Sequence, residues 1–270
     1  MRSAGVSTER HAEPGVRALS VGAAMLCLSV LADSGVEHYR GLFRNRVMVV
    51  PLAVSAVGAV GNLLAATVHR GFGRIGQAAL ALTGASGLGF HAWNILKRPG
   101  GLSWRNLFYA APAGAPAALV LAGVISALAR SIDRGSGRAV RRTARFAGGV
   151  VSVGIAGTVA EAWLLHFRGA FHNRAMYLPV SIPPLAAASL AVDAIDGKPR
   201  PRTALLLGAT ALMGLGGVGF HAYGVSRNMG GWRNWRQNVL AGPPLPAPPS
   251  FTGLAIAGLG ILAIMRHRRG

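Results

Sequence analysis

Two repeated motifs contain the side chains of this chain that are best suited to chemistry. His38 and His166 begin the shared pattern HxRGxFxNRxMxxP, and His91 and His221 lie in a second shared pattern, GxGFHA. The copies are separated by 128 and 130 residues and occur in the same order. Such self-similarity at a nearly constant distance indicates an internal duplication.

The histidines predict a cofactor site in each half of the chain. Imidazole is a common ligand of haem iron and of transition metals, and a helix bundle brings together side chains at one level of different helices. We therefore expect His38 to pair with His91, and His166 to pair with His221. Guanidinium groups bind carboxylates well, so the repeated arginines are candidates for binding haem propionates: Arg40, Arg46, Arg105, Arg168, Arg174 and Arg236.

Three acidic residues, Asp33, Glu37 and Glu161, lie within five residues before a motif histidine. An ionisable group inside a membrane span is costly and is therefore a functional candidate. Two histidines and one carboxylate per half would also suit a bound iron, copper or zinc ion. This alternative makes the three acids metal ligands together with the four histidines, although no HxxxH or ExxH spacing places two ligands on one helical face.

Three glycines precede the second histidine at the same positions in both copies, seven, four and two residues before it: Gly84, Gly87 and Gly89; Gly214, Gly217 and Gly219. Two interpretations remain open. Small residues permit close packing of membrane helices, or they leave a flat clearance for a porphyrin beside the histidine.

The remaining motif residues are expected to shape the turn between two helices. Gly41 and Gly169 would permit a tight turn. Asn45 and Asn173 would cap the helix that follows. The aromatic residues of both motifs are typical of the membrane interface.

The elements that must position these residues are membrane helices. The chain is 51% hydrophobic and 13% charged, well below the roughly 25% charged content of soluble domains. Eight apolar stretches each approach the ~20 residues that span a bilayer: 18–37, 47–68, 75–96, 107–129, 147–167, 175–195, 203–226 and 239–265. The sequence therefore predicts an all-α integral membrane protein with about eight transmembrane helices.

The duplication divides these helices into two tandem repeats of four. An even number of spans makes the copies parallel and places both sets of motifs on one side of the membrane. The predicted parts are a cytoplasmic N-terminal tail (1–17), a first repeat (18–130), a basic cytoplasmic linker (131–146), a second repeat (147–265) and a basic C-terminal tail (266–270). Prolines at 243–249, and at matching places in the first copy, predict non-helical backbone around a vestibule on the motif side.

The distribution of basic residues predicts the orientation. Of 28 Lys and Arg residues, 17 lie on the side of the termini and 11 on the side of the motifs. By the positive-inside rule both termini are cytoplasmic, so the net charge of +20 reflects topology rather than nucleic-acid binding. The predominance of Arg, Ala and Gly suggests a bacterial protein, which we expect to be a multi-pass protein of the plasma (inner) membrane. Its single cysteine, Cys27, excludes an intramolecular disulfide.

The leading functional hypothesis is a duplicated site on the outer face that binds haem or a redox metal, iron or copper, for electron transfer or an oxidation. One alternative is a proton-coupled transporter or permease for an anionic or small substrate. Another is a non-catalytic subunit of a membrane complex, which would have another membrane subunit or a redox partner. No phosphate-binding loop, nucleophile elbow or HExxH motif is present in the sequence, so whether the protein is an enzyme stays open.

Overall fold

The computed structural model describes residues 3–68 and 72–267, and this part of the chain contains helices but no strands. Eight helices are long: α1 (Ser3–Arg40), α2 (Val50–Val68), α3 (Arg74–Leu96), α5 (Gly114–Asp133), α6 (Gly137–Arg168), α7 (Ile182–Asp196), α8 (Pro201–Arg227) and α10 (Pro249–His267). The short elements are α4 (Trp104–Phe108), α9 (Trp235–Ala241) and the 3₁₀ helices η1 (Arg46–Val49), η2 (Arg174–Val180) and η3 (Gly231–Asn234). The outermost residues of both predicted tails, 1–2 and 268–270, lie outside the described residues.

Seven segments among the described residues are long and apolar enough to cross a membrane: Pro14–Arg40, Arg46–Val68, Gly114–Asp133, Gly137–Arg168, Arg174–Asp196, Pro201–Arg227 and Pro249–Arg266. The protein is thus a helical membrane protein whose solvent is the lipid bilayer. Helix α3 has 23 residues, but its mean hydropathy is too low for it to count among these segments. Its polar residues include Gln77, His91 and Asn94, so composition alone does not identify this predicted span as a membrane helix.

The helices extend beyond the apolar stretches at two places. Helix α1 begins at Ser3, so most of the predicted tail 1–17 is helical. The predicted linker 131–146 shrinks to three residues outside helices, because α5 ends at Asp133 and α6 begins at Gly137. A helix that leaves hydrocarbon continues into water without penalty to its backbone hydrogen bonds, so a basic composition does not mark where the helix ends.

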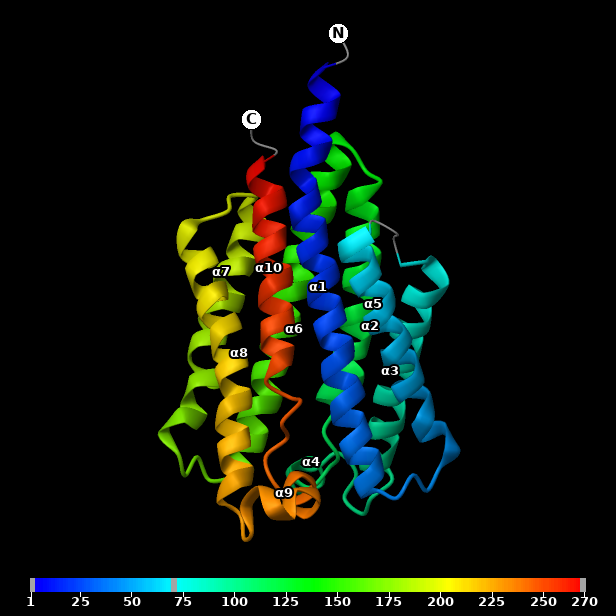
Figure 1. Ribbon diagram of the computed structural model, residues 1–270, viewed down its shortest axis with the longest axis vertical. Helices are drawn as coiled ribbons and strands as arrows, with labels where there is room; N and C mark the ends of the chain where they lie inside the picture. The colour runs from blue at the N-terminus through cyan, green and yellow to red at the C-terminus, as the bar shows by residue number, and fades with distance from the viewer. Residues whose placement is uncertain (1–2, 69–71, 268–270) are drawn as a thin grey trace.

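The central helices are α1, α5, α6 and α10. Helix α1 contacts α2, α5 and α10, whereas α6 contacts α7, α10 and α5. Helices α3 and α8 pack on α5 and α10, respectively. In Figure 1 the two termini lie at one end of the bundle, and α4 and α9 lie at the other.

Glycines allow the backbones of α1 and α10 to approach closely. A Cβ atom built on Gly22 would lie 2.5 Å from the carbonyl oxygen of Gly253, and one on Gly253 would lie 2.9 Å from that of Gly22. Gly15 and Gly260 face each other in the same way, at 2.8 and 2.6 Å. Any side chain at these positions would force the helices apart.

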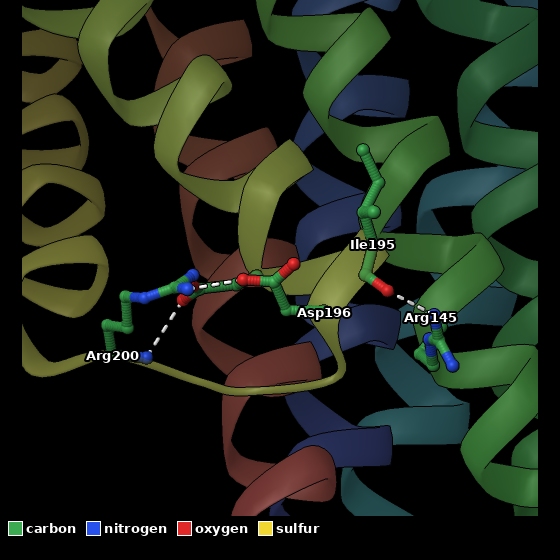
Figure 2. A network of polar contacts seen from close by, with 5 residues as sticks. Arg145, Ile195, Asp196 and Arg200 are labelled. Carbon is green, nitrogen blue, oxygen red and sulfur yellow. Dashed lines mark hydrogen bonds and ion pairs between the residues drawn. The ribbon is translucent and has the colours of Figure 1, made fainter.

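An ionic network closes the α7–α8 connection near the termini (Figure 2). Arg200 binds the buried carboxylate of Asp193, with Nη1 2.6 Å from Oδ1, and also pairs with Asp196. The two carboxylates, Asp196 above all, raise the pKa of Arg200 above its ordinary value. Arg145 of α6 donates to the carbonyl oxygen of Ile195 at the end of α7. Basic side chains near a helix C-terminus satisfy carbonyls that have no intrahelical partner, so this network joins α6, α7 and α8.

We expect Gly22→Ala to destabilise the protein. The added methyl group meets the backbone of α10, and overpacking of this kind typically costs about 1–3 kcal/mol. Gly35→Ala is the matched control in the same helix, because a Cβ at Gly35 meets nothing within 4 Å and Ala gains about 1 kcal/mol of helix propensity. Thermal unfolding in detergent, followed by tryptophan fluorescence, measures both variants. Equal unfolding temperatures for the two variants would contradict the close contact between α1 and α10.

Candidate functional site

The turns that follow α1 and α6 have the same backbone conformation. Leu42 and Phe43 have φ values of 58° and 45°, and Ala170 and Phe171 have values of 54° and 45°. These four residues occupy the left-handed region, which is costly for residues other than glycine. The motif glycines Gly41 and Gly169 lie in these turns, as expected, but the positive φ angles fall on the two residues after each glycine. The absence of a side chain at the glycine leaves room for a methionine methyl group. The methyl carbon of Met176 lies 3.1 Å from a Cβ built on Gly169.

The motif asparagines cap the 3₁₀ helices η1 and η2, as predicted. The side-chain oxygen of Asn45 accepts a hydrogen bond from the backbone N–H of Val47 at 3.0 Å. That of Asn173 accepts one from Ala175 at 2.9 Å. Each cap fixes where the chain leaves the turn.

The first histidine of each half forms a hydrogen bond across the turn that follows it. Nδ1 of His38 lies 2.7 Å from the carbonyl oxygen of Met48, and Nδ1 of His166 lies 2.9 Å from that of Met176. A carbonyl oxygen only accepts, so Nδ1 carries the proton in both rings. In a neutral imidazole the other nitrogen, Nε2, is then unprotonated and can act as a ligand or a base.

The second histidine of each half faces the non-helical segment before α5 or α10. Nδ1 of His221 donates to the carbonyl oxygen of Pro244 at 2.7 Å. His91 lines a cavity of about 210 Å³ together with Ala110 and Ala111, and its buried Nδ1 has no hydrogen-bond partner among the described residues. Each second histidine therefore sits where a proline-containing segment interrupts the helical backbone.

The predicted histidine pairs lie near each other. His38 is close enough to His91 for their charges to interact, and the same holds for His166 and His221. All four rings are half-buried. Each pair joins the turn after α1 or α6 to the C-terminal part of α3 or α8, at the end of the bundle opposite the termini (Figure 1).

The glycines of the second motif serve helix packing. A Cβ atom on Gly84 would lie 2.6 Å from the carbonyl oxygen of Pro116, and one on Gly214 would lie 2.8 Å from that of Pro248. The glycines three residues later contact the same two prolines. At these four positions α5 and the residues around Pro248 fill the space and leave no clearance for a porphyrin, whereas a Cβ on Gly89 or Gly219 would meet nothing within 4 Å.

The predicted acidic residues turn away from the histidines. Glu37 pairs with Arg40 at 2.7 Å. The carboxyl group of Glu161 lies against the first turn of α5, with its carbon 3.2 Å from a Cβ built on Gly114. Asp33 is close enough to both glutamates for their charges to interact. The structure thus divides the predicted constellation into two histidine pairs and one group of acids between α1 and α6.

Two motif arginines reach from one half of the chain to the other. Arg40 donates to the carbonyl oxygen of Leu240 at the end of α9. Nη2 of Arg168 donates to the carbonyl oxygens of Leu107 and Ala110, at 3.1 and 3.2 Å, after the last turn of α4. Each arginine therefore stabilises the C-terminal end of a short helix that belongs to the other half.

The remaining predicted arginines differ in their surroundings. Arg236 donates to the hydroxyl group of Tyr39, and its guanidinium group lies 5.6 Å from the centre of that ring. Arg46, Arg105 and Arg174 are exposed. The expected carboxylate-binding arginines therefore do not form one cluster.

Sequence reasoning overlooked two asparagines that organise the loops before α5 and α10. Nδ2 of Asn106 donates to the carbonyl oxygen of Gly101, and Nδ2 of Asn238 donates to that of Gly231, both at 2.8 Å. Both side chains are buried. The sequence feature that could have revealed them is an asparagine after each Trp-Arg pair. It follows the first pair directly and the second pair one residue later.

The described residues contain no group of three or more His, Cys, Asp or Glu side chains placed to hold a metal ion. The expected set of two histidines and one carboxylate is therefore not assembled in either half. No known protein family, curated protein or solved structure matches this chain, so the site is interpreted from its own geometry.

We expect Arg168→Gln to loosen α4. A hydrogen bond from a charged group is worth about 1.5–3 kcal/mol, and this variant removes two such bonds to the end of α4. Hydrogen–deuterium exchange of residues 104–110, measured by mass spectrometry, would then be faster. Arg174→Gln, at an exposed arginine of the same motif, is the matched control and leaves this exchange unchanged. Identical exchange in both variants would contradict the contact.

Proposed function

We propose that each half of this protein binds one haem through its histidine pair, for electron transfer or an oxidation at the outer surface of the membrane. The single observation that carries the proposal is the bond from histidine Nδ1 to a backbone carbonyl in His38, His166 and His221. Metal-binding histidines almost always donate their other ring N–H in this way, which orients the ring and leaves Nε2 for the metal.

The number of available ligands favours haem over a non-haem metal. A zinc or non-haem iron site needs three or four protein ligands. Haem iron takes four ligands from the porphyrin and requires only axial ligands from the protein. Two histidines in each half match that requirement. Arg46 and Arg174, exposed on the two histidine turns, suit the propionates.

The architecture that we infer for this function is a tandem repeat of two parallel four-helix units, 18–130 and 147–265. In this arrangement α3 and α8 are corresponding helices. Matching histidine bonds, asparagine caps and helix contacts support it. With both termini in the cytoplasm of a bacterium, the histidine turns lie at the outer face of the plasma membrane. A redox partner or another membrane subunit would meet the protein there.

Absorption spectroscopy of the purified, detergent-solubilised protein tests this proposal. We expect a Soret band, either in the protein as purified or after titration with hemin. We expect up to two haems per chain, counted after extraction of the haem. The double variant H38A/H91A retains about half of the absorbance, and adding H166A/H221A removes the rest. His172→Ala is the control, because His172 lies on the same turn but outside the repeated pattern, and it keeps the full spectrum.

Two results would overturn the haem proposal. The first is a wild-type protein that remains colourless after titration with hemin. The second is stoichiometric iron or copper without a Soret band, which would favour a non-haem metal site.

A second candidate function is proton-coupled transport of an anion. The observation that favours it is the proximity of Asp33 on α1 and Glu161 on α6, within segments that are apolar enough to span the membrane. Carboxylates in such places mark proton pathways in many transporters.

Proteoliposomes that enclose a pH-sensitive dye test the transport function. With inorganic phosphate, citrate or lactate outside, we expect anion-dependent acidification of the lumen, which Asp33→Asn and Glu161→Gln reduce at least tenfold. Asp196→Asn, at the opposite end of the bundle, is the control. The absence of anion-dependent proton movement in the wild type, or an equal loss in all three variants, would contradict this function.

A further inference from the structure

A hollow of about 680 Å³ lies between the C-terminal end of α1 and α9. Its lining residues are Arg40, Asn234, Arg236, Gln237, Leu240 and Ala241. Two guanidinium groups and two amides thus surround a small apolar surface. All of these residues except the half-buried Leu240 are exposed, so the hollow is open to solvent.

The two arginines are held in place and keep hydrogen-bond donors to spare. Arg40 donates to Glu37 and to the carbonyl oxygen of Leu240. Arg236 donates to the hydroxyl group of Tyr39 and lies against its ring. A guanidinium group has five N–H donors in a planar fork, and these described side-chain bonds use two of them in Arg40 and one in Arg236. Glu37 offsets only one of the two positive charges.

Aromatic side chains occupy the corresponding region of the other half. Trp163 and Phe167 of α6 are stacked, with ring centres 5.2 Å apart. Phe167 also contacts Trp104 and Phe108 of α4, with ring centres at 6.2 and 6.1 Å. Arg168 lies against this cluster, 5.7 Å from the centre of the Phe108 ring. The place next to the motif arginine is therefore filled with rings.

Residue size distinguishes these two regions. Gly35 takes the place of Trp163, 128 residues apart like the first histidines of the two motifs. The matched bonds of Asn106 and Asn238 align α4 with α9, so Leu240 takes the place of Phe108. A Cβ on Gly35 would meet nothing within 4 Å. A glycine and an aliphatic side chain thus stand where the other half carries two large rings.

We propose that this hollow binds an organic anion with a phosphate or carboxylate head group and an apolar portion. Guanidinium forks recognise these head groups by bidentate, charge-assisted hydrogen bonds, while Leu240 and Ala241 contact the apolar part. The same chemistry is present in an anionic lipid and in a water-soluble phosphate ester. The site is separate from the histidine pairs, so it does not depend on whether they bind haem.

Isothermal titration calorimetry of the full-length protein, in neutral detergent at low salt, tests the proposal. The probes are dihexanoyl phosphatidylglycerol, butyl phosphate and the zwitterionic dihexanoyl phosphatidylcholine. We expect saturable binding of the lipid phosphatidylglycerol, of butyl phosphate, or of both, and the preferred probe identifies the source of the head group. Phosphatidylcholine binds at least tenfold more weakly.

Matched variants connect this binding to the hollow. Arg236→Gln removes one guanidinium group and weakens binding at least tenfold, whereas Arg105→Gln, at the exposed arginine of the other Trp-Arg pair, leaves it unchanged. Leu240→Phe restores a ring at the place of Phe108 and weakens binding without changing the charge. Tryptophan fluorescence during thermal unfolding verifies that each variant is folded.

Three outcomes would overturn the proposal. One is that neither anionic probe binds the wild type. Another is that phosphatidylcholine binds as tightly as the anionic probes, which would indicate an apolar surface only. The third is that Arg105→Gln and Arg236→Gln lose affinity equally, which would indicate attraction to the basic surface as a whole.

Discussion

The close backbone contact between α1 and α10 is the constraint on which the rest of the structure depends. Helices in hydrocarbon gain little from the hydrophobic effect when they associate, so they rely on van der Waals packing through small residues. Gly22 and Gly253 provide that packing between α1 and α10, which lie side by side (Figure 1). Because α1 leads into the first histidine turn and α9 precedes α10, this contact also brings Arg40 to the end of α9.

Neighbouring residues of one motif serve different regions because a helix points them in different directions. Glu37 and His38 are adjacent in the sequence, whereas residues three or four apart share a helical face. Glu37 and Arg40 therefore pair with each other and Arg40 reaches α9, while His38 bonds to η1. This single repeated motif thus provides both a local turn and a contact between the two halves of the chain.

The two halves share contacts but differ in the volume of their side chains. Interiors are close-packed, so the loss of a large ring leaves space unless neighbours move in. Gly35 and Leu240 replace rings that fill the corresponding place beside Arg168. A hollow therefore lies beside Arg40, whereas aromatic rings lie beside its counterpart Arg168. Similar backbones in this way support different surfaces.

The sequence by itself determined the membrane helices, the repeated turns and the asparagine caps, because hydropathy, spacing and hydrogen bonds within a few residues decide these features. The equal depth of the motif histidines also predicts the two histidine pairs, and this pairing stays a prediction. Only the tertiary structure decided that Gly84 packs on α5, that Glu161 faces the start of α5 and that Arg168 holds α4. These contacts depend on which helical faces meet, and that choice is made by packing between segments distant in the chain, which local sequence does not encode.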